Sequence, residues 1–103
     1  MIKVSVLYPN NGGSKFDMVY YVQKHMALGR EKLGTACKGI TVDQGLAGGA
    51  SGTQPTYIAM GHLLFDSAES FQAAFAPHAE TIMADISNYT AIQPIIQISE
   101  VKM

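Results

Sequence analysis

The sequence predicts an α+β domain in which helices cover one face of a four-stranded antiparallel sheet. Residues 2–8 alternate strongly apolar side chains with others at the period of two that is typical of a strand, and residues 57–65 form an apolar run of strand length. Each is followed by a segment with helical spacing and then by a further strand-like segment. The order of strand, helix, strand, then strand, helices, strand is that of the ferredoxin-like split βαβ arrangement.

The composition sets limits on the domain and its partners. The 103 residues have the length of one domain, residues 1–103, with 48% hydrophobic and only 15% charged residues, so some apolar surface is expected to face a partner. The net charge of -1, with basic residues scattered singly, argues against nucleic acid. A single cysteine, Cys37, fits a reducing compartment. Without a signal-sequence pattern or a membrane-length apolar run, we expect a cytoplasmic protein with no membrane partner.

The first half of the chain is expected to hold a strand, a helix and a second strand. Ser14 followed three residues later by Asp17 resembles a capping box, so the helix should begin just after Ser14. Its apolar spacing extends over residues 16–28, and Gly29 and Gly34 are expected to make its far end irregular. Residues 38–45 alternate as a half-buried strand.

The middle of the chain predicts a mobile loop and a strand with two apolar faces. Residues 45–55 are rich in glycine and carry few large side chains, which favours a mobile loop. The strand over residues 57–65 places Met60 and Leu64 on one face and other apolar side chains on the opposite face, so both faces should be covered. A chain of this length has no second layer to spare. We therefore expect a homodimer in which two sheets pack face to face.

The last third of the chain predicts two helical segments and an edge strand. Asp66 and Glu69 frame a second capping pattern, and Pro77 restarts a helix because proline is tolerated at a first helical position. A final strand is expected over residues 90–101. Pro94 within it favours an edge or bulged position, since proline cannot donate to a neighbouring strand.

Three side chains are candidates for catalytic chemistry: His25, His78 and Tyr21. Tyr21 and His25 are four residues apart and should share a helix face, and imidazole suits general acid–base chemistry. His78 falls in the first turn of its helix, where a neutral ring would be suited to donating a hydrogen bond to a carbonyl. The structural alternatives are a helix-end histidine bonded to a carbonyl for His25 and packing against Phe75 for His78.

Other motifs do not predict a bound metal or cofactor. The three histidines lack the spacing of a metal site on one element, so no metal is expected. The glycine-rich residues 48–52 precede a strand rather than a helix, which is wrong for a phosphate or dinucleotide loop. His62 is expected on the dimer face or the pocket wall as a core histidine. Cys37 has no activating neighbour in sequence and is interpreted as a buried thiol.

The sequence resembles the EthD family, named for ethyl tert-butyl ether degradation, within the dimeric α/β-barrel group. The similar residues are Met1-Ile2-Lys3-Val4, Tyr20-Tyr21, Lys24-His25-Met26, Leu28, and the segment from Phe71 through Phe75 and Ala76-Pro77-His78 to Ile82, Asp85, Ile86 and Asn88-Tyr89-Thr90. Ala27 departs from the family pattern, which often has proline there. The resemblance spans nearly the whole chain and implies two ferredoxin-like domains that pair through their sheets.

The resemblance also implies a function. Relatives in the barrel group include monooxygenases, lactone isomerases and polyketide cyclases or dehydratases, and family labels lean towards oxidoreductase. The expected activity is that of a cofactor-independent enzyme acting on a largely apolar aromatic or lactone-like compound, with His25 as acid–base and His78 and Tyr21 as orienting groups. The alternative is a non-catalytic binding or accessory protein of an oxidative degradation pathway, since an apolar pocket with few polar groups binds well without catalysing.

Overall fold

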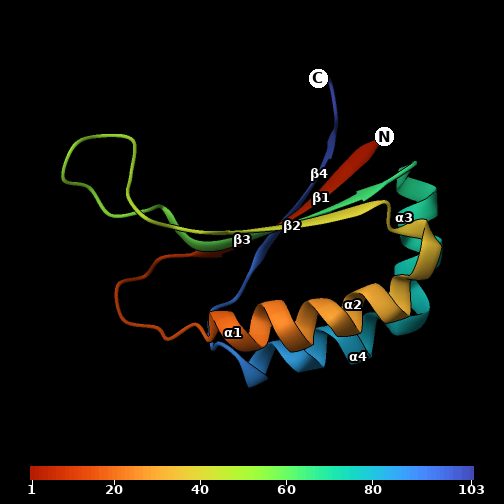
Figure 1. Ribbon diagram of the computed structural model, residues 1–103, viewed down its shortest axis with the longest axis horizontal. Helices are drawn as coiled ribbons and strands as arrows, with labels where there is room; N and C mark the ends of the chain where they lie inside the picture. The colour runs from red at the N-terminus through yellow and green to blue at the C-terminus, as the bar shows by residue number, and fades with distance from the viewer.

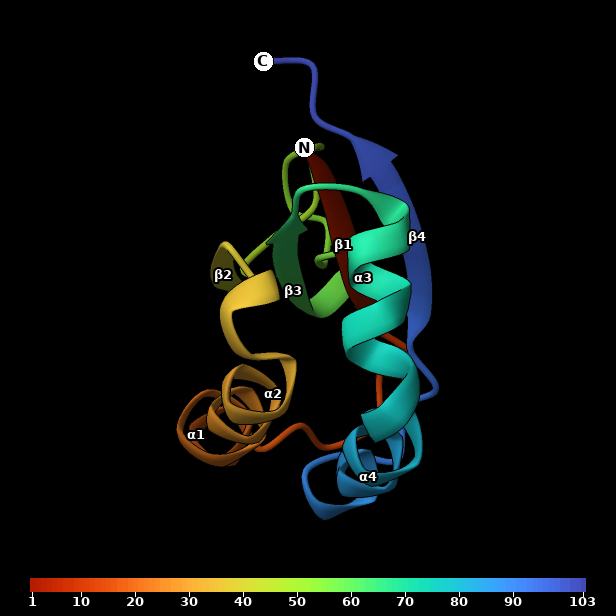
Figure 2. The ribbon, with the colours of Figure 1, turned by 90° about the vertical axis from the view of Figure 1, so that its right-hand side faces the viewer.

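The computed structural model describes all 103 residues and has the predicted ferredoxin-like α+β fold. Its four strands form one antiparallel sheet in the spatial order β2-β3-β1-β4, so β1 and β3 are central. All helices lie on one side of this sheet, as Figures 1 and 2 show. The strands are β1 (Ile2–Pro9), β2 (Gly39–Gln44), β3 (Tyr57–Phe65) and β4 (Ile95–Glu100).

The helical layer consists of two stretches, one after β1 and one after β3. The first comprises α1 (Met18–Tyr20), a π-helical turn η1 (Tyr21–His25), α2 (Met26–Leu33) and a 3₁₀ turn η2 (Gly34–Ala36). The second comprises α3 (Ala68–Phe75), a 3₁₀ turn η3 (Ala76–His78), α4 (Ala79–Ala84) and a 3₁₀ turn η4 (Asp85–Asn88). None of these helices combines the length and apolar character needed to cross a membrane.

The first helix starts later than its sequence predicts. Ser14 does not cap it, because Phe16 forms a β-bridge with Thr90 and the helix begins only after that bridge. Asp17 is the N-cap instead: its side chain accepts a hydrogen bond from the backbone N–H of Tyr20 at 3.0 Å. A bridge between residues so far apart in sequence overrides the local capping pattern.

The first helix ends at one of the two glycines that were expected to make its far end irregular. Gly29 is buried inside α2 rather than at its end, and the helix continues to Leu33. Gly34 follows with φ of 62°, a backbone conformation that glycine adopts without steric cost. Of the two glycines expected at the far end, Gly34 terminates the helix and Gly29 does not.

Two further boundaries differ from the predictions. Ser67, not Asp66, is the N-cap of α3, with its hydroxyl accepting the backbone N–H of Ser70 at 3.0 Å. The last strand begins at Ile95, directly after Pro94, because proline has no N–H to donate to β1. The position of β4 at the edge of the sheet is as predicted.

The sheet face beneath the helices holds the hydrophobic core. One cluster of buried residues comprises Tyr8, Tyr21, Met26, Ala59, Tyr89 and Ile92. A second comprises Val4, Leu33, Phe65 and Ile82. Because side chains alternate along a strand, the odd-numbered residues of β3 that reach this face are small near Tyr21 and large at Phe65. Tyr21 and Met26 of the helical layer fill the space above the small residue Gly61.

The opposite sheet face carries no helix. On it, the Ser5 hydroxyl oxygen lies 2.8 Å from Nδ1 of His62, and Nε2 of His62 lies 3.5 Å from a carboxylate oxygen of Asp43. Met60 and Leu64 share this face with His62 and are only half-buried. The loop between β2 and β3 extends away from the sheet in Figure 1, and its mobility stays a prediction.

Candidate functional site

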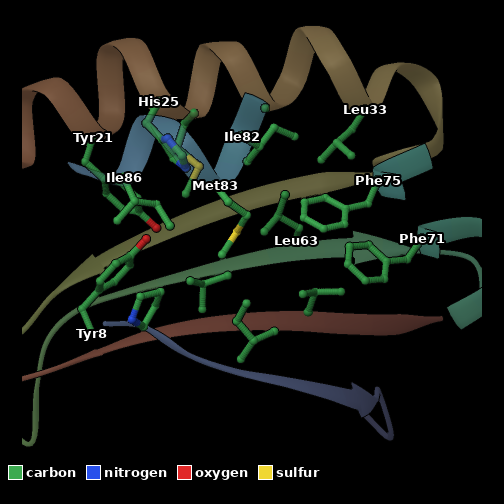
Figure 3. A pocket seen from close by; sticks show the side chains of 16 residues that line it. Tyr8, Tyr21, His25, Leu33, Leu63, Phe71, Phe75, Ile82, Met83 and Ile86 are labelled. Atoms are coloured by element: carbon green, nitrogen blue, oxygen red, sulfur yellow. The ribbon is translucent and has the colours of Figure 1, made fainter. Parts of the chain in front are cut away.

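A cavity lies between the helical layer and the sheet, with a volume of ≈ 90 Å³. Figure 3 shows the side chains that line it, which come from both helical stretches and from three strands. Thirteen of its 16 lining residues are hydrophobic. Two of them, Met83 in α4 and Ile96 in β4, are 40% and 48% exposed, so the cavity opens to solvent between these elements. The site is therefore an apolar pocket that is open to solvent on this side.

The polar groups of the pocket gather at one end. Tyr8, Tyr21 and His25 lie together there, while the other end is formed by aliphatic and phenyl groups. The lining of the apolar end comprises Leu33, Leu63, Phe71, Phe75 and Ile82. A molecule in this pocket would meet hydrogen-bonding groups at one end only.

The Asp85 carboxylate in η4 interacts with the His25 imidazole on the side of Nδ1. His25 is 8% exposed, and its Nδ1 lies 2.9 Å from a carboxylate oxygen of Asp85. The other carboxylate oxygen accepts hydrogen bonds from the Tyr20 hydroxyl at 2.7 Å and from the Asn88 amide at 2.9 Å. The carboxylate thus joins the two helical stretches and fixes the orientation of the histidine ring.

This network sets the protonation of Asp85. Partial burial by itself would raise the pKa of the carboxyl, but hydrogen bonds from Asn88, Tyr20 and His25 outweigh it and hold the pKa below its ordinary value. An ionised carboxylate can only accept, so Nδ1 of His25 carries the proton. Nε2, which has no hydrogen bond within the protein, remains available to a molecule in the cavity.

Tyr21 and His25 share a helix face, as their spacing predicts, and their rings stack with centroids 5.6 Å apart at 17°. They bound the π-helical turn, in which the backbone N–H of Met26 donates to the carbonyl of Tyr21. Such turns are uncommon and are frequent at functional sites. No local sequence pattern predicts this turn.

The Tyr21 hydroxyl is buried and has no hydrogen-bond partner in the protein. It lies against the backbone of β3 at Gly61, where a Cβ atom would overlap it. Burial, together with the nearby Tyr8 hydroxyl, raises the pKa of Tyr21 well above its ordinary value. The phenol therefore remains protonated at physiological pH.

Tyr8 and Tyr89 complete the polar end. Their hydroxyl oxygens are 2.6 Å apart, and burial raises the pKa of both phenols. Tyr89 also contacts the ring of His25, with centroids 4.8 Å apart. Figure 3 shows the Tyr8 and Tyr21 hydroxyls pointing toward one another. Aromatic groups from β1, η1 and the segment after η4 thus meet at one point.

The structure brings together two of the three predicted site residues. His78, in η3, is half-buried but is not among the side chains that line the pocket. Asp85 and Tyr8 belong to the site, yet no sequence pattern assigned them to it. Asp85 appeared only among the residues of the family resemblance. No group of three or more His, Cys, Asp or Glu side chains lies close enough to hold a metal ion.

The fold is a ferredoxin-like α+β fold with an apolar pocket between its helices and its sheet, and the EthD domain family matches residues 14–93. The chain belongs to the EthD domain family. It is 49% identical to an EthD-like protein from Ralstonia eutropha JMP134 whose crystal structure superposes with a TM-score of 0.95, covering 99% of this chain and 92% of that one.

More distant structures share the fold. An EthD family protein from Bacillus halodurans C-125 is 18% identical with a TM-score of 0.67, covering 99% of each chain. A proposed antibiotic biosynthesis monooxygenase from Bordetella bronchiseptica is 10% identical with a TM-score of 0.58, covering 99% of this chain and 96% of that one. None of the curated proteins matches the sequence significantly. The family and fold support a small-molecule enzyme or binding role.

Proposed function

We propose that this protein is a cofactor-independent enzyme that binds a small, largely apolar aromatic or lactone-like compound and uses His25 for acid–base chemistry. The observation that carries the proposal is the His25–Asp85 pair on the wall of an apolar pocket, with Nδ1 and carboxylate 2.9 Å apart. A carboxylate behind an imidazole fixes its tautomer and stabilises the imidazolium that forms when Nε2 takes a proton. Tyr21 serves as an orienting group beside it.

The reaction type that fits this arrangement is proton transfer next to a carbonyl. Nε2 of His25 would remove a proton from the carbon beside the carbonyl, leaving an enol or enolate, and would return a proton to the same or a neighbouring atom. Isomerisation, cyclisation and dehydration all contain this step, and so does formation of an oxygen-reactive enolate. His78, outside the pocket lining, has no contact that supports a direct role in this step.

Exchange of carbon-bound hydrogen tests the acid–base role without knowledge of the natural substrate. Acetophenone in D₂O should lose its methyl proton signal faster with the protein than without it, because each removed proton is replaced by deuterium. His25→Gln should abolish the excess rate, while His78→Gln should retain it. The CD spectrum and melting temperature of each variant show whether it is folded.

A non-catalytic binding protein is the second candidate, favoured by the 13 hydrophobic residues among the 16 that line the pocket. The same experiment separates the two. Binding of the ketone without excess exchange, in wild type and His25→Gln alike, would overturn the enzyme proposal and leave the binding role.

A homodimer is also part of the proposal. The accessible surface of 6410 Å² exceeds the roughly 5,700 Å² expected of a monomer of this mass. The radius of gyration of 14.0 Å exceeds the roughly 12.8 Å expected for this length. Both differences follow naturally if a single layer of helices leaves one sheet face for a second copy. The single cysteine supports a reducing, cytoplasmic compartment for this dimer.

A further inference from the structure

The open face of the sheet, opposite the helices, carries a polar cluster at its centre. The Ser5 hydroxyl oxygen in β1 lies 2.8 Å from Nδ1 of His62 in β3, and Nε2 of His62 lies 3.5 Å from a carboxylate oxygen of Asp43 in β2. Ser5 and His62 are directly opposite one another, midway along the register of β1 with β3, the two central strands. An ionisable imidazole thus lies at the middle of a sheet face that no helix covers (Figure 2).

The surroundings of this cluster suit contact with a second copy of the chain. Thr41 lies beside His62 on β2, and Gln97 lies beside Ser5 on β4, so a row of polar side chains crosses the sheet. Hydroxyl, amide and neutral imidazole groups can each donate and accept hydrogen bonds, and can therefore pair with copies of themselves. The apolar side chains on either side of the row are half-buried or exposed in the single chain: Leu7, Met60, Leu64 and Ile95. A second copy packed over the row would remove them from water.

The symmetry of such a dimer determines which residues meet. In a two-fold dimer both copies use the same surface, so residues at the centre of that surface lie next to the axis and meet their own copies. His62 occupies this centre, and sheets that pack face to face are about 10 Å apart. The imidazoles of the two copies should therefore come close to each other in the middle of the interface.

The charges on the open face balance only while His62 is neutral. The ionisable groups on this face are Lys3 in β1, Asp43 in β2 and His62 itself in β3, while β4 contributes uncharged side chains. A proton on His62 therefore leaves one uncompensated positive charge on each copy. In a separate chain, water and the Asp43 carboxylate, whose side chain is 54% exposed, can offset this charge. In a dimer the water is excluded and two imidazolium groups face each other, which disfavours association.

We propose that His62 makes the homodimer sensitive to pH: the two copies associate through the open sheet face while His62 is neutral, and protonation of His62 separates them. The inference rests on the homodimer of the proposed function and is independent of the pocket. Imidazole is the side chain whose charge ordinarily changes between about pH 5 and 8. Because the dimer holds fewer protons than the separate chains, its affinity is full at the upper end of this range and is lost as pH falls. His25 in η1 and His78 in η3 belong to the helical layer on the other side of the sheet, so among the histidines only His62 can act at this interface.

Sedimentation equilibrium at about pH 7.5 and about pH 5.5 tests this dependence, and the CD spectrum shows whether the chain is folded at both. The dimer dissociation constant of wild type should rise at least about tenfold at the lower pH, because like charges at an interface oppose association. His62→Gln keeps a group that can hydrogen-bond to Ser5 but cannot take a proton, so its dissociation constant should change by less than about twofold.

His78→Gln is the matched control, because it removes a histidine from the helical side of the sheet. It should retain the pH dependence of wild type. A wild-type dissociation constant that is the same at both pH values would overturn the inference, and so would a pH effect of equal size in wild type and His62→Gln.

A titration of wild type tests the inference without relying on the association of a variant. The ring-proton NMR signal of His62, identified by its loss in His62→Gln, is followed against pH at protein concentrations below and above the dimer dissociation constant. Association favours the neutral ring, so the midpoint of the titration should lie at lower pH in the more concentrated sample. A midpoint that does not depend on concentration overturns the inference and leaves the homodimer intact. A wild type that stays monomeric at micromolar concentration and about pH 7.5 removes the homodimer, and this inference fails with it.

Discussion

Replacing Gly61 with alanine should test how closely Tyr21 packs against the sheet, because the substitution adds one methyl group beneath the tyrosine hydroxyl. It lies in the middle of β3, opposite Val6 of β1 and Val42 of β2, and is buried beneath Tyr21. A Cβ atom there would overlap the Tyr21 hydroxyl oxygen and would lie 2.9 Å from Cε of Met26. The backbone of Gly61 does not have positive φ, so alanine meets a packing obstacle and no conformational one.

Two opposing effects determine how much Gly61→Ala changes the free energy of unfolding. Alanine reduces the freedom of the unfolded chain, which stabilises by about 0.4–1 kcal/mol at a compatible position. Overpacking a filled core costs typically about 1–3 kcal/mol, and Tyr21 is 1% exposed with its ring packed against other rings, so it cannot move aside freely. The cost of overpacking should exceed the gain from the less flexible unfolded chain, so Gly61→Ala should lower the free energy of unfolding by about 1–2 kcal/mol.

Combining Gly61→Ala with Tyr21→Phe tells whether the tyrosine oxygen causes the loss of stability. In Tyr21→Phe the overlapping atom is gone, the ring carbon Cζ would be 3.4 Å from the new Cβ, and the methyl of Met26 can rotate away. The cost of Gly61→Ala should then fall below about 0.5–1 kcal/mol, giving a coupling of roughly 1 kcal/mol between the two positions.

The assay is urea unfolding followed by CD at one protein concentration, because a dimer would make stability concentration-dependent. Gly49→Ala is the matched control: a Cβ there meets nothing within 4 Å, and its φ is not positive. It should change stability by less than about 0.5 kcal/mol. An equal cost of Gly61→Ala in the wild-type and Tyr21→Phe backgrounds would refute the packing argument.

Two further predictions concern Asp85 and the open sheet face. Because the folded-state pKa of Asp85 is lowered, its stabilising contribution is present above the unfolded pKa of about 4 and is lost as pH falls through the folded value. Asp85→Asn should therefore be about 1–3 kcal/mol less stable than wild type by urea unfolding at pH 7, with a smaller gap at pH 3; a gap that stays constant with pH would contradict this. For the sheet face, light scattering at micromolar concentration should give twice the chain mass for wild type and for Val19→Asp on the exposed helix surface, and the chain mass for Met60→Asp. A monomeric wild type would remove the homodimer from the proposal.

The amino-acid sequence determined the elements and their order because the signals for them are local. The alternation in β1 places Val4 and Tyr8 on one face whatever the strand pairs with, and a period of two cannot be mistaken for a helix. The spacing of Tyr21 and His25 likewise placed both rings on one helix face. The boundaries of the elements were predicted less accurately. The first helix starts later than predicted because Phe16 pairs with Thr90, and this bridge depends on residues far apart in the chain.

Tertiary structure alone decided the composition of the site. Asp85 reaches His25 across 60 residues, and Tyr8 reaches Tyr89 across 81, because two helical stretches and β1 converge at one end of the sheet. His78 was a candidate on its position in a first helical turn, yet in η3 it is not among the residues that line the cavity. Local sequence fixes which way a side chain points from its own element, but the partners it meets depend on how elements pack. Packing is set by the fit of the whole core, which no short segment encodes.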